Sequence, residues 1–246
     1  MSEAERINQE KTIVDLAWTA GWDSTFRLLQ LLLIKKKCVR PHYIVRSESS
    51  TGQEIDAMNR IRRKLFADWP ETREALMPTR FVDVRSILIK PEINAEYERV
   101  KEQKKVVEQY LLLACYRFQE RLDKIEIGIH SGDSGWRLAG EKLFEGFSLP
   151  LHDLDKKGMR RLAIEHGFAD IMDLTVFCRR PKRGKPCGFC GPCHDAVALG
   201  MGYRLPLTRR LVATLQSPLR RWWRGNYAQM NPTLKRVASR FLGGRY

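Results

Sequence analysis

The chain has 246 residues, 43% of them hydrophobic and 9% aromatic, so it can bury a core the size of one large domain and is not disordered throughout. The longest apolar run, 28–34, contains Gln30 and is followed by lysines, which excludes a membrane span of about 18 apolar residues. Because the first residues are polar and acidic, we expect no secretory signal, a cytoplasmic location and reduced cysteines.

The net charge of +15 is distributed unevenly along the chain. Residues 196–246 contain ten Lys and Arg and no acidic residue, which places two thirds of the excess in the last fifth of the sequence. Such a cationic extension indicates an anionic partner. We therefore treat 201–246 as a separate basic extension.

Strand-like and helix-like patterns alternate over the first 166 residues. Short apolar runs predict strands at 12–18, 39–45, 80–84 and 124–129. Apolar residues at helical spacing predict helices at 24–35, 53–68, 96–121 and 156–166. This alternation is typical of a doubly wound, mostly parallel α/β sheet of the Rossmann-like class.

A loop of small and polar residues separates the first predicted strand from the first predicted helix: Thr19-Ala20-Gly21-Trp22-Asp23-Ser24-Thr25. In open α/β sheets ligands bind at the carboxyl ends of the strands, and a helix N-terminus favours phosphate. Gly21 allows close approach of the backbone, the loop hydroxyls can donate to phosphate oxygens, and Asp23 suits Mg²⁺. An ordinary strand–turn–helix corner, with Asp23 as the N-cap, explains the same residues about equally well.

Four cysteines form the strongest pattern in the sequence: Cys178, Cys187, Cys190 and Cys193. Four thiolates complete a tetrahedral shell, and the intervening glycines and proline favour the tight turns that such a site needs. A ferredoxin-type cluster would place a cysteine at 197, where Val197 stands. We therefore predict a structural Zn²⁺ with no open coordination position, within a small module over 175–200.

These motifs, taken together, resemble the PP-loop ATP pyrophosphatase superfamily and, within it, the 7-cyano-7-deazaguanine synthase family. The Thr-Ala-Gly-Trp-Asp-Ser loop is similar to the Ser-Gly-Gly-x-Asp-Ser pyrophosphate loop, with Ala20 in place of the first glycine. The segment from Ile127 to Gly135 resembles the substrate segment of that family. Pro150-Leu151, followed by Lys156, resembles its helix leading to the first zinc cysteine, and the cysteine spacing resembles its zinc site. The motifs occur in order between residues 12 and 199.

The resemblance implies a fold of the adenine nucleotide alpha hydrolase type, with a PP-loop ATP-binding domain over 1–174. It implies that Asp23, Ser24 and Lys156 are catalytic and that ATP and Mg²⁺ bind the loop. Adenine is expected near Ala17, Ile44, Val45 and Arg46, and the substrate near His130, Asp133, Ser134 and Gly135. The implied enzyme adenylates 7-carboxy-7-deazaguanine and converts it with ammonia to the amide and then the nitrile.

Departures from this family pattern surround the substrate segment. His130 stands where the family has Asn, Trp136-Arg137 replaces Tyr-Pro-Asp-Cys, and Gly158 replaces Glu. The adenylating chemistry is therefore better supported than the acceptor. Two alternatives remain: an enzyme with another acceptor, such as a tRNA base or a group on a protein partner, and a non-catalytic nucleotide- or nucleic-acid-binding protein.

The basic extension mixes cations with aromatic residues, as in Arg220-Arg221-Trp222-Trp223-Arg224. This composition suits a nucleic acid or an acidic protein partner. The leucines between 205 and 219 suit equally well a helix packed on the core or on a second subunit of a homodimer. An anionic membrane surface is a third, weaker alternative.

Overall fold

The computed structural model describes residues 13–104, 106–131, 133–226, 231 and 233. Lys235 and Arg236 of the basic extension therefore lie outside the described residues. The chain divides into two compact units. The first unit comprises Met1–Ser47 and Glu54–Thr175, and the second comprises Glu48–Gln53 and Val176–Tyr246.

The first unit is built on a five-stranded sheet in the order β3-β2-β1-β4-β5. All four neighbouring pairs are parallel, which confirms the predicted α/β class. The strands are β1 (Ile13–Ala17), β2 (Cys38–Val45), β3 (Arg80–Asp83), β4 (Ile125–Ile127) and β5 (Phe147–Ser148). The strand order reverses between β1 and β4, which makes the carboxyl ends of these two strands the topological switch point where ligands bind in such sheets.

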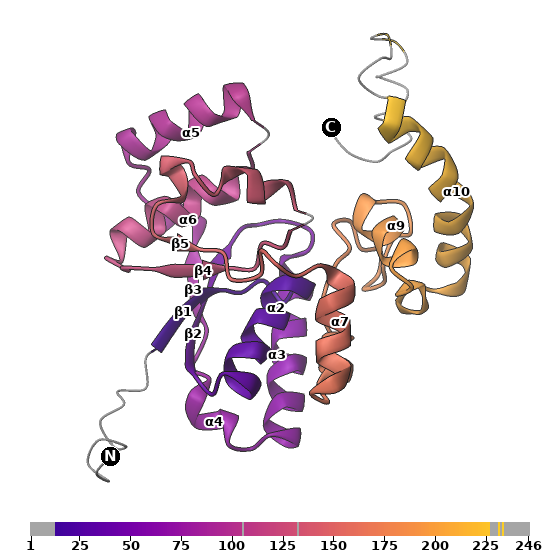
Figure 1. Cartoon of the computed structure of the whole chain (residues 1–246), viewed down its shortest axis with the longest axis horizontal. Coiled ribbons are helices and arrows are strands. Elements are labelled where there is room, and N and C mark those ends of the chain that lie inside the picture. The colour runs from indigo at the N-terminus through magenta and orange to yellow at the C-terminus, as the bar shows by residue number, and fades with distance from the viewer. Residues whose placement is uncertain (1–12, 105, 132, 227–230, 232, 234–246) are drawn as a thin grey trace. The chain divides into compact units, whose positions relative to one another are not determined.

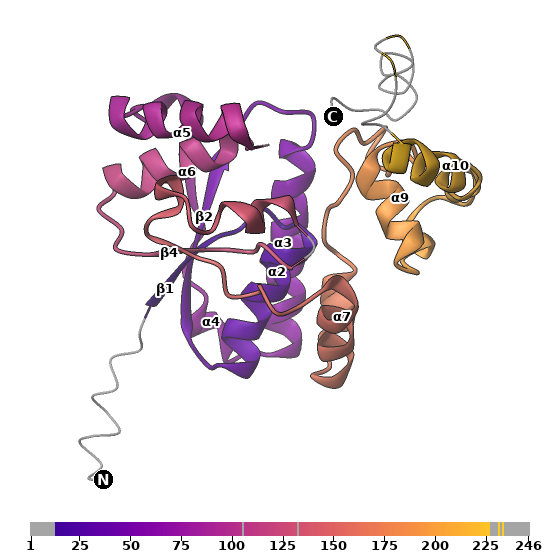
Figure 2. The ribbon, with the colours of Figure 1, turned by 45° about the horizontal axis from the view of Figure 1, so that its top comes forward.

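Helices cover both faces of this sheet (Figures 1 and 2). On one side lie α2 (Trp22–Leu29), which continues into a π-turn (Gln30–Ile34), α3 (Thr51–Asp68) and α7 (Lys156–Glu165). The opposite side carries α5 (Pro91–Gln103) and α6 (Glu108–Gln119). Two short helices, α4 (Thr72–Ala75) and α8 (Ala169–Met172), complete the helices of this unit. Crossovers between parallel strands are right-handed as a rule, so a strand order that reverses at β1 and β4 places helices on both faces.

The single helix predicted over 96–121 is wrong, because two helices occupy this region. Lys104 (φ −135°, ψ 153°) and Val107 (φ −99°, ψ 143°) are extended and separate α5 from α6. The break allows the charged α5 to fold back, so that Tyr97 and Val100 join the cluster formed by the apolar half of α6. One straight helix would have carried these two side chains away from that cluster. Tertiary burial therefore outweighs the local continuity of the helical pattern.

A polar network crosses the sheet beneath α6. The Asp15 carboxylate accepts hydrogen bonds from Arg40 at 2.5 and 2.8 Å and from His42 Nε2 at 2.6 Å. His42 Nδ1 lies 2.7 Å from the Tyr116 hydroxyl. Burial alone would raise the pKa of Asp15, but the hydrogen bonds from His42 and Arg40 outweigh burial and lower the pKa to about 2. This network ties β1, β2 and α6 together.

The second unit contains α9 (Gly191–Ala198), a 3₁₀ turn (Gly202–Arg204) and α10 (Leu207–Asn226). Leu205 and Ala213 are buried, but Leu207, Leu211 and Leu215 are 70%, 56% and 79% exposed. Packing of these leucines on the core or on a second subunit therefore stays a prediction. Among the described residues, no helix combines the length and the hydrophobicity that crossing a membrane requires.

Candidate nucleotide site and metal centre

The loop after β1 lies at the switch point of the sheet. α2 begins at Trp22 with Gly21 as its extended N-cap (φ −73°, ψ 165°), so Asp23 lies inside the first turn and is not the N-cap. Ala20 is fully buried and adopts φ +51°, in the left-handed region that favours glycine. For an alanine this conformation costs about 1 kcal/mol. The loop thus retains a glycine-type backbone at a position that carries a methyl group.

The hydroxyl groups of the loop bond within it. Ser24 Oγ lies 3.3 Å from both the amide and the hydroxyl of Thr19. Trp18 Nε1 donates to Thr25 Oγ1 at 3.0 Å, and Thr25 is fully buried. Thr25 therefore stabilises the loop from inside, and a phosphate contact from its hydroxyl stays a prediction. Thr19, Gly21 and Asp23 are the partly exposed residues of the loop.

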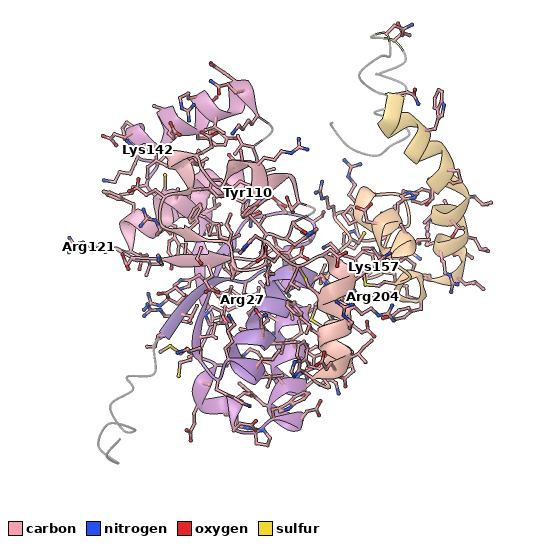
Figure 3. All side chains as sticks on the ribbon, in the orientation of Figure 1. Arg27, Tyr110, Arg121, Lys142, Lys157 and Arg204 are labelled. Carbon is pink, nitrogen blue, oxygen red and sulfur yellow. The ribbon has the colours of Figure 1, made fainter. Side chains whose placement is uncertain are left out.

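The carboxylate of Asp23 pairs with the ammonium of Lys156, which is distant in sequence. Lys156 Nζ lies 2.8 and 2.9 Å from the two carboxylate oxygens, and the two side chains are 25% and 20% exposed. Lys156 is the first residue of α7, whose N-cap, Asp155, accepts from the amide of Gly158 at 2.7 Å. The next residue, Lys157, is exposed at the same end of the helix (Figure 3). Two of the three predicted catalytic residues are therefore in direct contact.

Gly128, directly after β4, lies against the backbone of the loop. A Cβ atom on Gly128 would lie 2.7 Å from the amide nitrogen of Ser24 and 2.8 Å from the carbonyl carbon of Asp23. Only glycine allows the strand end and the helix N-terminus to approach this closely. The sequence contained this glycine within the predicted substrate segment, but only the structure gives it a role.

The predicted substrate segment runs beside the segment that leads to Lys156. His130 forms a parallel bridge with Leu151. The amide and hydroxyl of Ser131 lie 3.3 and 3.2 Å from the Leu154 carbonyl oxygen, to which they donate. The loop, the segment after β4 and the start of α7 therefore meet at one edge of the sheet. These are three of the segments on which the family resemblance rests.

Asp133 caps a 3₁₀ turn (Ser134–Leu138) by accepting from the amide of Gly135 at 2.8 Å. Gly135 lies against the hydroxyl of Tyr110, on α6 (Figure 3). Burial, with a smaller contribution from the Asp133 carboxylate, raises the pKa of Tyr110 above its usual range, so this hydroxyl stays protonated. The side chain of Ser134 lies outside the described residues. Sequence analysis had not singled out Tyr110, because a tyrosine on an apolar helix is usually a packing residue.

Two aromatic side chains stack near this turn. Trp136, 39% exposed, stacks on His152 with ring centroids 5.3 Å apart and an interplanar angle of 13°. The sequence offered no signal for this pair, since the residues are distant in the chain and His152 resembled an ordinary surface histidine.

The residues expected near adenine lie at the ends of β1 and β2. Ala17 is buried and pairs with His42 in the sheet register, and Ile44 packs on the same cluster as Ala17. Val45 pairs with Asp83 on β3. Arg46, just beyond β2, donates to Glu108 at 2.9 Å. Ala17 leads directly into the loop, whereas Arg46 is held by its ion pair.

Arg27 and Glu126 form a second ion pair that sequence analysis missed. Arg27, on α2 (Figure 3), donates to both carboxylate oxygens of Glu126, on β4, at 2.6 and 2.9 Å. The two side chains are only 5% and 15% exposed. This bidentate pair fixes α2 against β4 and so supports the loop between them.

The four cysteines of the second unit converge as predicted. All are buried, and their sulfur atoms lie within 4.8 Å of one another. The Sγ–Sγ distances include 3.4 Å for Cys190–Cys193 and 3.9 Å for Cys178–Cys190 and for Cys187–Cys193. One tetrahedral ion with metal–sulfur bonds of about 2.3 Å separates its ligands by about 3.8 Å. These four thiols therefore fit a single metal ion.

Backbone amides support this cysteine cluster. The amide of Cys187 donates to Cys178 Sγ at 3.2 Å, and the amide of Phe189 donates to Cys187 Sγ at 3.4 Å. Gly188 has φ +77°, and a Cβ there would lie 2.8 Å from the carbonyl oxygen of Arg209. Hydrogen bonds among these thiols lower the pKa of Cys190 and raise the pKa of Cys178 and of Cys193. Cys190 is therefore the thiol of this cluster most readily held as thiolate, the form that binds a metal.

Comparison with known proteins gives little further information. No protein family matches the sequence, and no curated protein matches it. A U34-tRNA thiolase, NcsA from Methanococcus maripaludis, solved with its 4Fe-4S cluster, aligns with 98% of this chain and 76% of that chain. The identity is 13% and the TM-score is 0.39. A likeness at this level carries no argument about activity, so function has to be inferred from the residues of this chain.

Proposed function

We propose that the first unit is an ATP-dependent adenylating enzyme of the PP-loop type. The observation that carries this proposal is the Asp23–Lys156 pair at the switch point of the sheet, beside the N-terminus of α2. In this proposal the phosphates of ATP lie on the backbone of Thr19–Ser24, Lys156 contacts a phosphate and Asp23 holds Mg²⁺. Helix N-termini and lysine favour phosphate, and carboxylate oxygens are ligands for Mg²⁺.

The ion pair itself suits such a site. A carboxylate next to a phosphate site would repel the ligand, but Lys156 balances the charge of Asp23 while no nucleotide is bound. Mg²⁺ offers Asp23 a cation and the ATP phosphates offer Lys156 an anion, so each member of the pair can exchange its partner for another of opposite charge. The hydrogen bonds of Ser24 with Thr19 and of Thr25 with Trp18 hold the loop in its conformation next to this ion pair.

Adenylation activates a carboxylate, because it replaces a poor leaving oxygen by AMP and releases pyrophosphate. The acceptor that the family resemblance favours is 7-carboxy-7-deazaguanine, with ammonia as the nitrogen donor. Asp133 can accept hydrogen bonds from the ring N–H and amino groups of such a heterocycle, and the protonated Tyr110 hydroxyl can donate beside it. His130 and Gly135 belong to the same predicted substrate segment.

A second candidate keeps the adenylation and changes the acceptor. Trp136, which stacks on His152, stands where the family pattern has Tyr-Pro-Asp-Cys, so the region that would contact the heterocycle differs in this chain. A tRNA base, or a carboxylate or amine on a partner protein, is the alternative acceptor.

Pyrophosphate release from ATP tests both candidates. Release that depends on 7-carboxy-7-deazaguanine and ammonia supports the first, and release that depends on RNA or a protein supports the second. Lys156→Met should abolish release, whereas Lys157→Met, at the exposed neighbouring position, should leave it within about twofold, because a solvated lysine contributes little. Full activity of Lys156→Met, or no release with any acceptor, would overturn the proposal.

For the metal centre we propose one structural Zn²⁺ bound by Cys178, Cys187, Cys190 and Cys193. The sulfur separations suit a single ion, whereas the thiolates of a four-iron cluster bind four different irons and lie farther apart. Four protein ligands leave no position for substrate, so the ion would stabilise the second unit and take no part in the reaction. Metal analysis of the purified chain should find one zinc per chain, and stoichiometric iron with sulfide would contradict this assignment.

A further inference from the structure

The segment between the first two metal-site cysteines carries a dense group of exposed cations. Five of the seven residues in 179–185 are Lys or Arg, and all five are exposed: Arg179, Arg180, Lys182, Arg183 and Lys185. Residues 176–246 contain fifteen of the 44 Lys and Arg of the chain and one of its 29 acidic residues. The net charge of +15 therefore belongs almost entirely to this part of the chain.

The backbone presents these cations on a tight hairpin. Lys182 and Lys185 exchange two backbone hydrogen bonds of 2.9 and 3.0 Å. Between them Arg183 and Gly184 have φ values of +50° and +76°, as a two-residue hairpin turn of the primed type requires. The amide of Cys187 bonds to the sulfur of Cys178, so both ends of the segment join at the metal site. Such preorganisation reduces the entropy lost when a ligand is bound.

Two aromatic rings of the same unit each have a guanidinium group over the ring. Phe189, which is 37% exposed, lies 5.2 Å from the guanidinium of Arg209. Phe177 lies 4.8 Å from the guanidinium of Arg204. Of these two rings Phe189 is exposed and Phe177 is half-buried, and exposed rings beside cations are what proteins use to bind bases and phosphates of single strands. By contrast, the tip of the hairpin has no apolar side chain that could enter a lipid bilayer.

We propose that the segment 179–185, here called the cationic hairpin, binds the phosphodiester backbone of a nucleic acid. This inference goes beyond the adenylating activity, since the binding requires neither ATP nor the Asp23–Lys156 pair. Regularly spaced phosphates match closely spaced cations on a rigid loop, and Phe189 with Arg209 over its ring adds an aromatic–cation pair in the same unit. The metal would contribute indirectly, by holding the two ends of the cationic hairpin together.

The test is an equilibrium titration of the full chain with a labelled single-stranded RNA of about 20 nucleotides, followed by fluorescence anisotropy. Five phosphate contacts predict a slope of about −3.5 for the logarithm of affinity against the logarithm of salt concentration. Affinity should therefore fall about a hundredfold between about 50 and about 200 mM salt. Single-stranded DNA of the same sequence and a folded tRNA, run in parallel, identify which nucleic acid binds best.

Matched charge reversals distinguish binding at the cationic hairpin from a general attraction by the net charge of the chain. Lys182→Glu with Arg183→Glu should weaken RNA binding roughly 25-fold at about 0.1 M salt and reduce the slope by about 1.4. Lys35→Glu with Lys37→Glu changes the charge equally at exposed positions of the first unit and should weaken binding less than about threefold. Metal content and circular dichroism verify that each variant is folded.

Several results would overturn the proposal. These are an equal loss of affinity in both double variants, an unchanged salt slope in the hairpin variant, and tighter binding of polyglutamate or anionic vesicles than of any nucleic acid. Failure here is distinguishable from failure of the proposed function. Lys156→Met should bind RNA normally, and the hairpin variant should release pyrophosphate normally with a small-molecule acceptor.

Discussion

The two units of this chain are stabilised in different ways. The first unit holds nearly equal numbers of acidic and basic residues and buries side chains on both faces of a parallel sheet. The second unit has little sheet structure among its described residues, and its four cysteines are buried together. A hydrophobic core supports the first unit, whereas the second relies on the packing of α9 with α10 and on a cysteine cluster that could hold a metal.

This difference also separates the proposed roles. In the first unit the numbers of acidic and basic residues nearly cancel. The electrostatic potential at the strand ends is therefore set mainly by the local carboxylate and ammonium and not by the net charge of the unit. A unit with fifteen cations and few anions produces a long-range attraction for polyanions. The following four predictions test how far the two units are independent, from the largest expected effect to the smallest.

Loss of one metal-site cysteine should affect the second unit alone. Cys190→Ser is expected to abolish metal binding and unfold the second unit, because structural zinc contributes about 10–16 kcal/mol of apparent binding free energy in small zinc domains. Metal analysis and limited proteolysis should show new cleavage between 176 and 226 and continued protection of the first unit. The control is Cys38→Ser, which removes a buried thiol outside the site. Retained metal, or collapse of both units, would contradict the prediction.

A methyl group at Gly128 should affect the first unit alone. Gly128→Ala places a Cβ within 2.8 Å of the backbone of Asp23 and Ser24 and should lower the free energy of unfolding by about 1–3 kcal/mol. Pyrophosphate release should fall with it. In Gly140→Ala the new Cβ meets no atom within 4 Å, so this variant should unfold like the original chain. Urea denaturation of both variants provides the comparison, and equal stabilities would show that the close approach is absent.

Acid should destabilise the first unit through Asp15. Its pKa falls from an ordinary value of 3.8 to about 2 on folding, so the ionised carboxylate contributes about 2 kcal/mol of stability. Because the folded pKa is the lower one, this contribution is complete above about pH 4 and is lost as the pH falls through about 2.

Asp15→Asn should therefore lower the free energy of unfolding near pH 6 and make little difference near pH 2, as measured by denaturant unfolding at both pH values. Residues 176–246 hold only one acidic residue, so their stability should respond far less to acid in this range. A deficit in Asp15→Asn that is independent of pH would mean that the carboxylate charge is not what stabilises the sheet.

The smallest effect is expected at Ala20. Ala20→Gly removes the strain of an alanine at φ +51° and should raise the free energy of unfolding by several tenths to about 1 kcal/mol, since the greater entropy of unfolded glycine offsets part of the gain. Thermal unfolding measures the change. A loss of stability would place this residue in the ordinary helical or extended region of the backbone. The metal content of the second unit should not change.

Local patterns were sufficient for several features. The apolar runs predicted the strands that became β1 to β4, and the cysteine spacing predicted four thiols that lie within reach of one ion. These features depend on neighbours in the sequence, and short-range sterics and ligand geometry act over that distance. The position of the loop after β1 follows in the same way from a strand, small residues and a helix.

Contacts between distant segments were decided only by the tertiary structure. The break between α5 and α6 depends on which side chains find a shared core, and a continuous helical pattern carries no information about that. The role of Gly128 depends on a backbone that lies about a hundred residues earlier in the chain.

The candidate nucleotide site shows the same division. The types of residue at Asp23 and Lys156 were evident from the sequence, but their separation of 2.8 Å arises because parallel strands bring their carboxyl ends to one edge of the sheet. The exposure of the five cations in 179–185 likewise follows from a turn anchored at two cysteines. Sequence determines which chemical groups are present and how each segment prefers to fold, whereas burial and chain topology determine which groups meet.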